Sequence, residues 1–174
     1  MSKAQLKKQL KNFDAGQLSE LVLELYCSNQ DIKEYMEFWL NPDSEALAEK
    51  YGDKLLKCFA HSGYWRRKPD VRKAKAVVER FVSFRPDPLC IIKMYLNLSG
   101  YILQCGAFVT LEKLKTAATV LRKAMVEAEA NGVYSQFEND MKNMAQAYKE
   151  RCYNYQVTEY FPSQLLEPIK NTTL

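Results

Sequence analysis

The sequence has little of what small secreted proteins, metalloproteins and turn-rich β folds depend on. Among 174 residues there are six Gly, six Pro and one histidine, His61. The five cysteines are an odd number and include no CxxC pair, which disfavours a disulfide framework and a zinc or redox motif. One histidine excludes a His-rich metal site, and the few turn-forming residues disfavour an all-β fold.

The sequence also lacks the motifs that assemble a reaction centre. The six glycines stand apart along the chain, so neither a GxGxxG sequence nor a Walker A loop is present. No glutamate is followed three residues later by a histidine, so the Glu-x-x-His motif of di-iron helical bundles is absent. We therefore expect a protein that is not an enzyme, with no metal site, no cofactor and no small-molecule substrate.

Long apolar runs are missing as well. Residues 1–8 show no apolar stretch, so we expect no secretory signal. Residues 89–109 have the length of a membrane span but contain Lys93, Asn97 and Gln104, whose polar groups are costly inside a bilayer. We expect this stretch to be a central buried helix, no membrane contact, and a reducing cytoplasm as the compartment.

The sequence does contain apolar residues that recur every three or four positions, the period of an α-helix, along almost its whole length. For example, Ile32, Tyr35, Met36 and Trp39 fall at positions i, i+3, i+4 and i+7. Such stripes and their flanking capping residues predict eight helices, at about residues 6–13, 14–26, 29–40, 43–59, 70–82, 87–106, 110–131 and 137–152.

Specific signals mark several helix ends. Asp14 followed by Gln17 predicts a capping box. Residues 41–43, Asn-Pro-Asp, end one helix and start the next, and residues 85–88, Arg-Pro-Asp-Pro, predict a second hard break. Residues 131–132, Asn-Gly, predict a C-terminal stop.

Eight helices with short connections predict an all-α fold. We expect a single domain over residues 1–174, built as a helical-hairpin bundle or a short solenoid-like stack. A true repeat array is the weaker alternative because no fixed-period self-similarity is present. Within the domain we expect an acidic helical half at 1–62, a loop at 63–69, a second helical half at 70–152 and an irregular tail at 153–174.

The net charge of +4 is ordinary, but its distribution is uneven. The balance of charged residues is +4 over residues 1–13, −8 over 14–53, +8 over 54–93 and zero over 94–174. The acidic and basic blocks either pair within the fold or leave two surfaces of opposite charge. The sequence leaves both arrangements open.

Several stretches carry a family resemblance. Residues 2–10 (SKAQLKKQL), 17–21 (QLSEL) and 32–42 (IKEYMEFWLNP) resemble an uncharacterised bacterial family, a domain of unknown function, and residues 84–88 (FRPDP) also fit it. The resemblance covers roughly the first half of the chain. It implies no catalytic motif and assigns no functional residue.

The strongest functional signal is a basic segment around residues 65–75. Its Trp and cationic residues are Trp65, Arg66, Arg67, Lys68, Arg72, Lys73 and Lys75. Cations in a loop before a helix N-terminus would attract phosphates, and the aromatic ring would stack on bases. In the structural alternative, the tryptophan anchors the loop to the core and the cations pair with acidic residues or stay solvated.

Cys58 and His61 are the one pair at a spacing useful for nucleophilic chemistry. Residues three apart share a helical face, so the imidazole would stabilise a thiolate. In the structural alternative Cys58 belongs to the core and His61 lies at a helix C-terminus, where the helix dipole favours it. No third group that would orient the pair is evident.

Taken together, these observations favour a non-enzymatic, cytoplasmic protein-interaction or adaptor module. Its partner would be another protein or a second copy of the chain, because opposed charges suit self-association. The alternative is a nucleic-acid- or polyanion-binding protein that uses the basic segment at 65–75.

Overall fold

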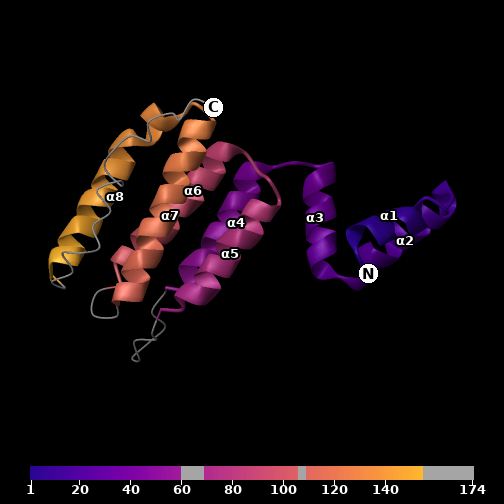
Figure 1. Ribbon diagram of the computed structural model, residues 1–174, viewed down its shortest axis with the longest axis horizontal. Coiled ribbons are helices and arrows are strands. Elements are labelled where there is room, and N and C mark those ends of the chain that lie inside the picture. The colour runs from indigo at the N-terminus through magenta and orange to yellow at the C-terminus, as the bar shows by residue number, and fades with distance from the viewer. Residues whose placement is uncertain (60–68, 106–108, 155–174) are drawn as a thin grey trace. The chain divides into compact units, whose positions relative to one another are not determined.

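The computed structural model of the chain describes residues 1–59, 69–105 and 109–154. Within these ranges every regular element is an α-helix (Figure 1), which confirms the predicted all-α fold. In chain order the eight described helices are α1 (Lys3–Leu10), α2 (Ala15–Ser28), α3 (Gln30–Leu40), α4 (Ser44–Lys57), α5 (Val71–Ser83), α6 (Pro88–Leu103), α7 (Leu111–Ala130) and α8 (Tyr134–Asn154).

Side-chain caps explain where the first helices begin. The Asp14 carboxylate accepts a hydrogen bond from the Gln17 backbone N–H at 2.8 Å, and the Gln17 side chain accepts one from the Asp14 N–H at 3.1 Å. This reciprocal pair is the predicted capping box. Ser2 and Gln5 form a second box at the start of α1, with distances of 3.2 and 2.8 Å, which was not expected from the sequence.

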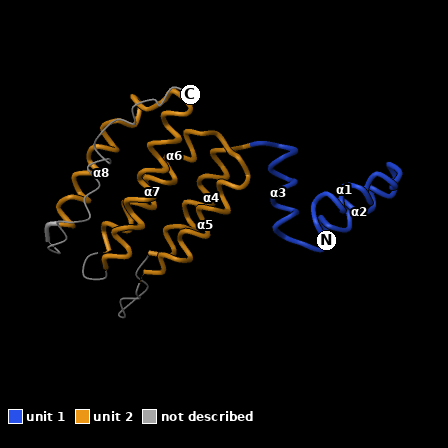
Figure 2. Tube along the Cα trace, in the orientation of Figure 1, with its two compact units in different colours: residues 1–42 blue, residues 43–174 orange. Residues whose placement is uncertain are grey.

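The chain divides into two compact units, residues 1–42 and residues 43–174 (Figure 2). The first unit holds α1 to α3 and the second holds α4 to α8. The division falls at the predicted break of residues 41–43. Of the predicted loop at 63–69 only Pro69 lies within the described residues, and of the predicted tail at 153–174 only the last two residues of α8 do.

In the first unit, α2 and α3 form a hairpin held by polar contacts. The Tyr26 hydroxyl donates to a Glu37 carboxylate oxygen at 3.0 Å. The Lys33 ammonium lies 4.0 Å from the Glu37 carboxylate and 5.4 Å from the centre of the Tyr26 ring. No residue of α1, α2 or α3 is buried, and all of residues 1–42 are described.

The second unit has a conventional apolar core with α6 at its centre. Ten of the sixteen residues of α6 are buried, which confirms the predicted central helix. The buried Ser99 hydroxyl donates to the Ala117 carbonyl of α7 at 3.1 Å, so its polar group is satisfied within the core. Tyr51 of α4 packs its ring 5.8 Å from that of Phe81 and 5.7 Å from that of Phe84.

Helix ends in the second unit follow the predicted breaks. Gly132 adopts a positive φ of 67° after α7, a backbone conformation in which glycine has no Cβ penalty. Asp87 caps α6 through a 2.7 Å hydrogen bond from the Leu89 N–H, and its own N–H donates to the Ser44 hydroxyl at 2.9 Å. The second contact ties the break before α6 to the start of α4.

Over the described ranges, no helix has both the length and the apolar composition needed to cross a bilayer.

Candidate functional site

The structure places part of the predicted basic segment. Trp65, Arg66, Arg67 and Lys68 lie outside the described residues. Arg72, Lys73 and Lys75 lie in the first turns of α5, and all three are exposed. The described half of the segment is therefore a solvent-facing basic surface at a helix N-terminus.

The start of α5 is fixed by a short set of backbone contacts. The Asp70 carboxylate caps the helix by accepting from the Lys73 N–H at 2.9 Å. The Asp70 N–H donates to the Cys58 carbonyl at 3.2 Å, which joins the start of α5 to the end of α4. Pro69 is buried beside this contact. The basic surface is thus anchored on a defined backbone.

A hollow of about 590 Å³ lies between the N-terminal turns of α5 and α7. Its lining includes the cations Arg72, Lys75 and Lys113 together with the acids Asp70 and Glu112. Two capped helix N-termini meet at it, where backbone N–H groups favour anions. No sequence pattern links Lys113 to the segment at 65–75, because only the packing of α5 and α7 around α6 brings these positions together.

Of the predicted pair of Cys58 and His61, the structure describes only Cys58, because His61 lies outside the described residues. Cys58 is half-buried, and its thiol donates to the Lys54 carbonyl at 3.4 Å. Burial raises the pKa of the Cys58 thiol; nearby Lys73 acts in the opposite direction and Asp70 adds to the rise. A raised pKa disfavours the thiolate that a nucleophile needs.

The acidic helices do not form a metal site within the described part of the chain. No group of three or more His, Cys, Asp or Glu side chains is gathered there in a way that would hold an ion. Glu37 is engaged by the Tyr26 hydroxyl and the Lys33 ammonium. The hydrogen bond that the Tyr26 hydroxyl donates to the Glu37 carboxylate is the main reason that the pKa of Tyr26 is raised.

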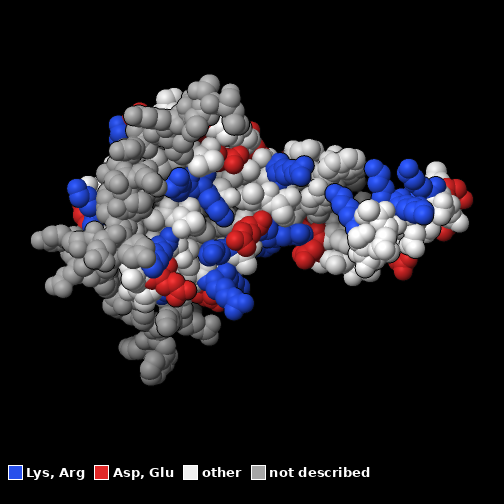
Figure 3. All heavy atoms as spheres, in the orientation of Figure 1, with Lys and Arg blue, Asp and Glu red and all other residues white. Residues whose placement is uncertain are grey.

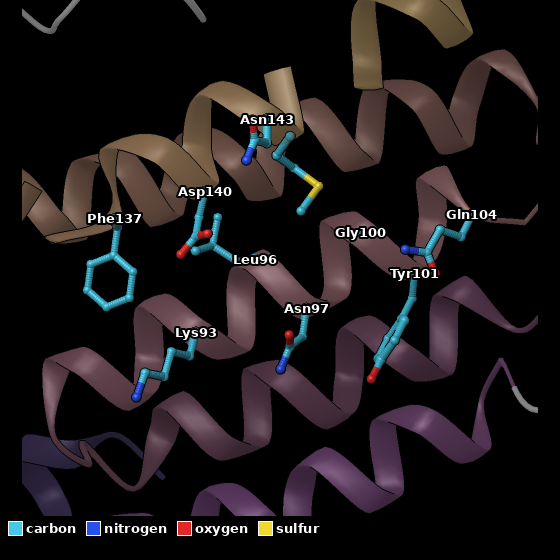
Figure 4. A pocket seen from close by; sticks show the side chains of 10 residues that line it. Lys93, Leu96, Asn97, Gly100, Tyr101, Gln104, Phe137, Asp140 and Asn143 are labelled. Carbon is cyan, nitrogen blue, oxygen red and sulfur yellow. The ribbon is translucent and has the colours of Figure 1, made fainter. Parts of the chain in front are cut away.

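An open groove of about 380 Å³ lies between α6 and α8. Figure 4 shows that its polar side chains come from both helices, Lys93 and Asn97 from α6 and Asp140 and Asn143 from α8, together with Gln104, which directly follows α6. Leu96, Gly100, Phe137 and Met144 supply apolar lining. A Cβ added to Gly100 would lie 3.2 Å from the Met144 Cε, so the glycine gives that side chain room. With one cation and one anion in its lining, the groove does not select a ligand by charge.

The most unusual surface belongs to residues 1–42. Four of its large apolar side chains are exposed to more than three-fifths, namely Met1 (83%), Trp39 (68%), Leu40 (63%) and Leu23 (62%). The other exposed large apolar side chains of the segment are Leu6, Phe13, Leu18, Val22, Leu25 and Tyr35. In residues 43–154, as far as they are described, only Leu56, Leu111 and Val126 share this property. The apolar stripes that predicted the first three helices are thus not part of a buried core: their residues are exposed or, like Ile32 and Met36, half-buried.

Comparison with protein families matches residues 1–162 to a family described as Family of unknown function (DUF6155). The matched range includes the first compact unit and residues 43–162 of the second, and it extends well beyond the stretches at 2–10, 17–21 and 32–42. A search of curated proteins and a search of solved structures found no match.

Proposed function

The chain belongs to the DUF6155 family of unknown function, and we propose that it is a non-enzymatic, cytoplasmic protein-interaction module. Its contact surface lies on residues 1–42. One observation carries this proposal: the three helices of the segment bury no residue, and ten large apolar side chains of residues 1–42 are exposed. Many exposed apolar side chains within one short segment are typical of a site that another protein covers.

The contrast with the second unit supports the proposal. There the amphipathic helices α4, α5 and α7 each bury an apolar stripe, for example Leu47, Tyr51 and Leu55 on α4. The same spacing of apolar residues in α2 and α3 leaves Leu18, Val22 and Trp39 exposed. Amphipathic helices are stabilised mainly by packing of the apolar face, so a protein partner would stabilise α1 to α3.

The cysteines agree with a reducing compartment. All five are unpaired thiols, and they range from exposed Cys27 to buried Cys90 and Cys152. Proteins of oxidising compartments that contain several cysteines usually pair them. This is the basis for the cytoplasmic part of the proposal.

The proposal is tested by cross-linking in cells that express the full chain. The photo-cross-linker p-benzoyl-phenylalanine replaces Trp39 in one variant and Leu56, an exposed residue of α4, in a matched control. We expect discrete protein adducts from position 39 and none from position 56. Absence of adducts from position 39, or the same adducts from both positions, would contradict an interaction surface on residues 1–42.

The hollow between α5 and α7 favours a second candidate function, binding of a nucleic acid or another polyanion. Arg72, Lys75 and Lys113 line it beside two helix N-termini. If these three cations contact phosphates of double-stranded DNA, raising the salt concentration from roughly 50 to 200 mM should lower the affinity for DNA about 40-fold.

Fluorescence anisotropy with labelled DNA and RNA at the two salt concentrations tests the second candidate. We expect Arg72→Glu/Lys75→Glu to abolish salt-sensitive binding. Lys57→Glu/Lys149→Glu, at exposed positions that do not line the hollow, should retain it. Equal binding by both variants, or no binding by the wild type at low salt, would rule out this use of the hollow.

A further inference from the structure

We infer that the groove between α6 and α8 is occupied by the chain's own C-terminal segment, through residues 160–166. The groove is separate from residues 1–42, so this inference goes beyond the proposed function. Three observations carry it: the lining of the groove, the length of chain between the groove and the end of α8, and the sequence that follows α8.

The lining of the groove suits an uncharged stretch of peptide. Its apolar members Leu96 and Phe137 are buried, whereas its charged and carboxamide side chains are exposed, so the groove has an apolar floor and a polar rim. The rim carries one cation and one anion. In the surface view, charged side chains of both signs likewise lie among uncharged ones on the face of the molecule that is drawn (Figure 3).

Carboxamide side chains stand on both walls of the groove. Asn97 belongs to α6 and Asn143 to α8, and both are exposed (Figure 4). A carboxamide both donates and accepts hydrogen bonds, and the backbone of an extended segment requires both kinds of partner. The groove therefore offers main-chain hydrogen bonds from either wall to a segment whose apolar side chains lie on the floor.

The groove lies within reach of the residues that follow α8. The groove residue closest to the end of α8 along the chain is Met144, and α8 ends at Asn154. The helix between them is about 15 Å long, a distance that about five extended residues cover. A chain that turns back after Asn154 therefore reaches the groove near residue 160. The α6 wall, from Lys93 to Gln104, is about 16 Å long, so residues 160–166 are enough to follow it.

The sequence has matching chemistry at that place. Residues 160–166 (YFPSQLL) contain no charged residue and are flanked on each side by a glutamate. Alternate residues of an extended segment face the same side, so Phe161 and Leu165 can both contact the apolar floor. Pro162 favours extended backbone at the residue before it. An uncharged, apolar run thus falls where the length of the chain places it over the groove.

Photo-cross-linking within the purified full-length chain tests the inference. The photo-cross-linker p-benzoyl-phenylalanine replaces Asn97 in one variant and Lys142, an exposed residue of α8 that does not line the groove, in a matched control. Lys142 is closer to the C-terminal segment along the chain, so it controls for simple proximity. We expect position 97 to give adducts of monomer mass within residues 160–166, located by peptide mass spectrometry, and position 142 to give none.

Substitutions in the segment test whether its apolar side chains hold it in the groove. Phe161→Asp/Leu165→Asp should abolish the adduct from position 97, because burying a charge on an apolar floor is costly. Thr172→Asp/Thr173→Asp, which lies outside residues 160–166, should retain it. Circular dichroism checks that each variant keeps its helices.

Four outcomes would overturn the inference. They are no adduct between position 97 and residues 160–166, such adducts only at the mass of two chains, equal adducts from positions 97 and 142, or equal yields from the two Asp variants.

Discussion

Among single side chains, solvent exposure separates the leucines that hold the fold from those that do not. Leu55 and Leu56 are neighbours in α4, yet Leu55 has no exposed surface and Leu56 is 47% exposed. We expect Leu55→Ala to lower the free energy of unfolding by about 2–5 kcal/mol, through lost burial and a cavity. Leu56→Ala should change it by no more than about 0.5 kcal/mol.

Urea denaturation followed by circular dichroism measures both variants in one experiment. The transition of Leu55→Ala should shift to lower urea, while that of Leu56→Ala stays near the wild type. Similar shifts in the two variants would mean that the packing of α4 against α5 and α6 is not as described.

The reactivity of Cys58 follows from its surroundings. Because burial raises the pKa of its thiol, little thiolate is present at neutral pH and alkylation is slow. We expect exposed Cys27 to react with iodoacetamide before Cys58 at about pH 7.5, and labelling of Cys58 to accelerate as the pH rises toward its raised pKa. Peptide mass spectrometry over a time course reads both sites. Faster labelling of Cys58 than of Cys27 would instead support a nucleophilic pair of Cys58 and His61.

At the level of helices, capping residues determine where each one starts. Asp70 is the clearest case, because its carboxylate accepts from the Lys73 N–H at 2.9 Å and its own N–H joins α5 to α4. We expect Asp70→Ala to destabilise the protein by about 0.5–2 kcal/mol, the usual value of an N-cap. Glu79→Ala, at an exposed position in the middle of the same helix, is the control and should be close to neutral in thermal or urea unfolding.

Most helix boundaries were predictable because their signals are local. The capping box of Asp14 and Gln17, the break at residues 85–88 and the stop at residues 131–132 each depend on a few adjacent residues. The box formed by Ser2 and Gln5 was missed because the predicted first helix was defined by its apolar residues, which start later at Leu6. Local chemistry therefore accounts for the elements and for most of their ends.

Which apolar faces are covered was not predictable, because periodicity identifies a face without showing what packs on it. The stripe of Leu18, Val22 and Leu25 has the same spacing as those of the second unit, but it is exposed. The candidate sites illustrate the same limit. The sequence identified Arg72 and Lys75, whereas the position of Lys113 beside them depends on the packing of α5 and α7 in three dimensions.

For the chain as a whole, we expect residues 1–42 to form the surface through which it associates with a protein partner. Affinity purification of the tagged full-length chain from cells, followed by quantitative mass spectrometry, tests this expectation with two variants of matched chemistry. Val22→Asp/Trp39→Asp alters exposed apolar residues of the first unit, and Leu56→Asp/Val126→Asp alters those of the second.

We expect the wild type and the Leu56→Asp/Val126→Asp variant to recover the same protein partner. Val22→Asp/Trp39→Asp should lose that partner with its helical circular dichroism retained, because charges at a desolvated contact oppose association. Equal recovery of the partner by all three proteins, or its loss only from the variant of the second unit, would contradict an association surface on residues 1–42.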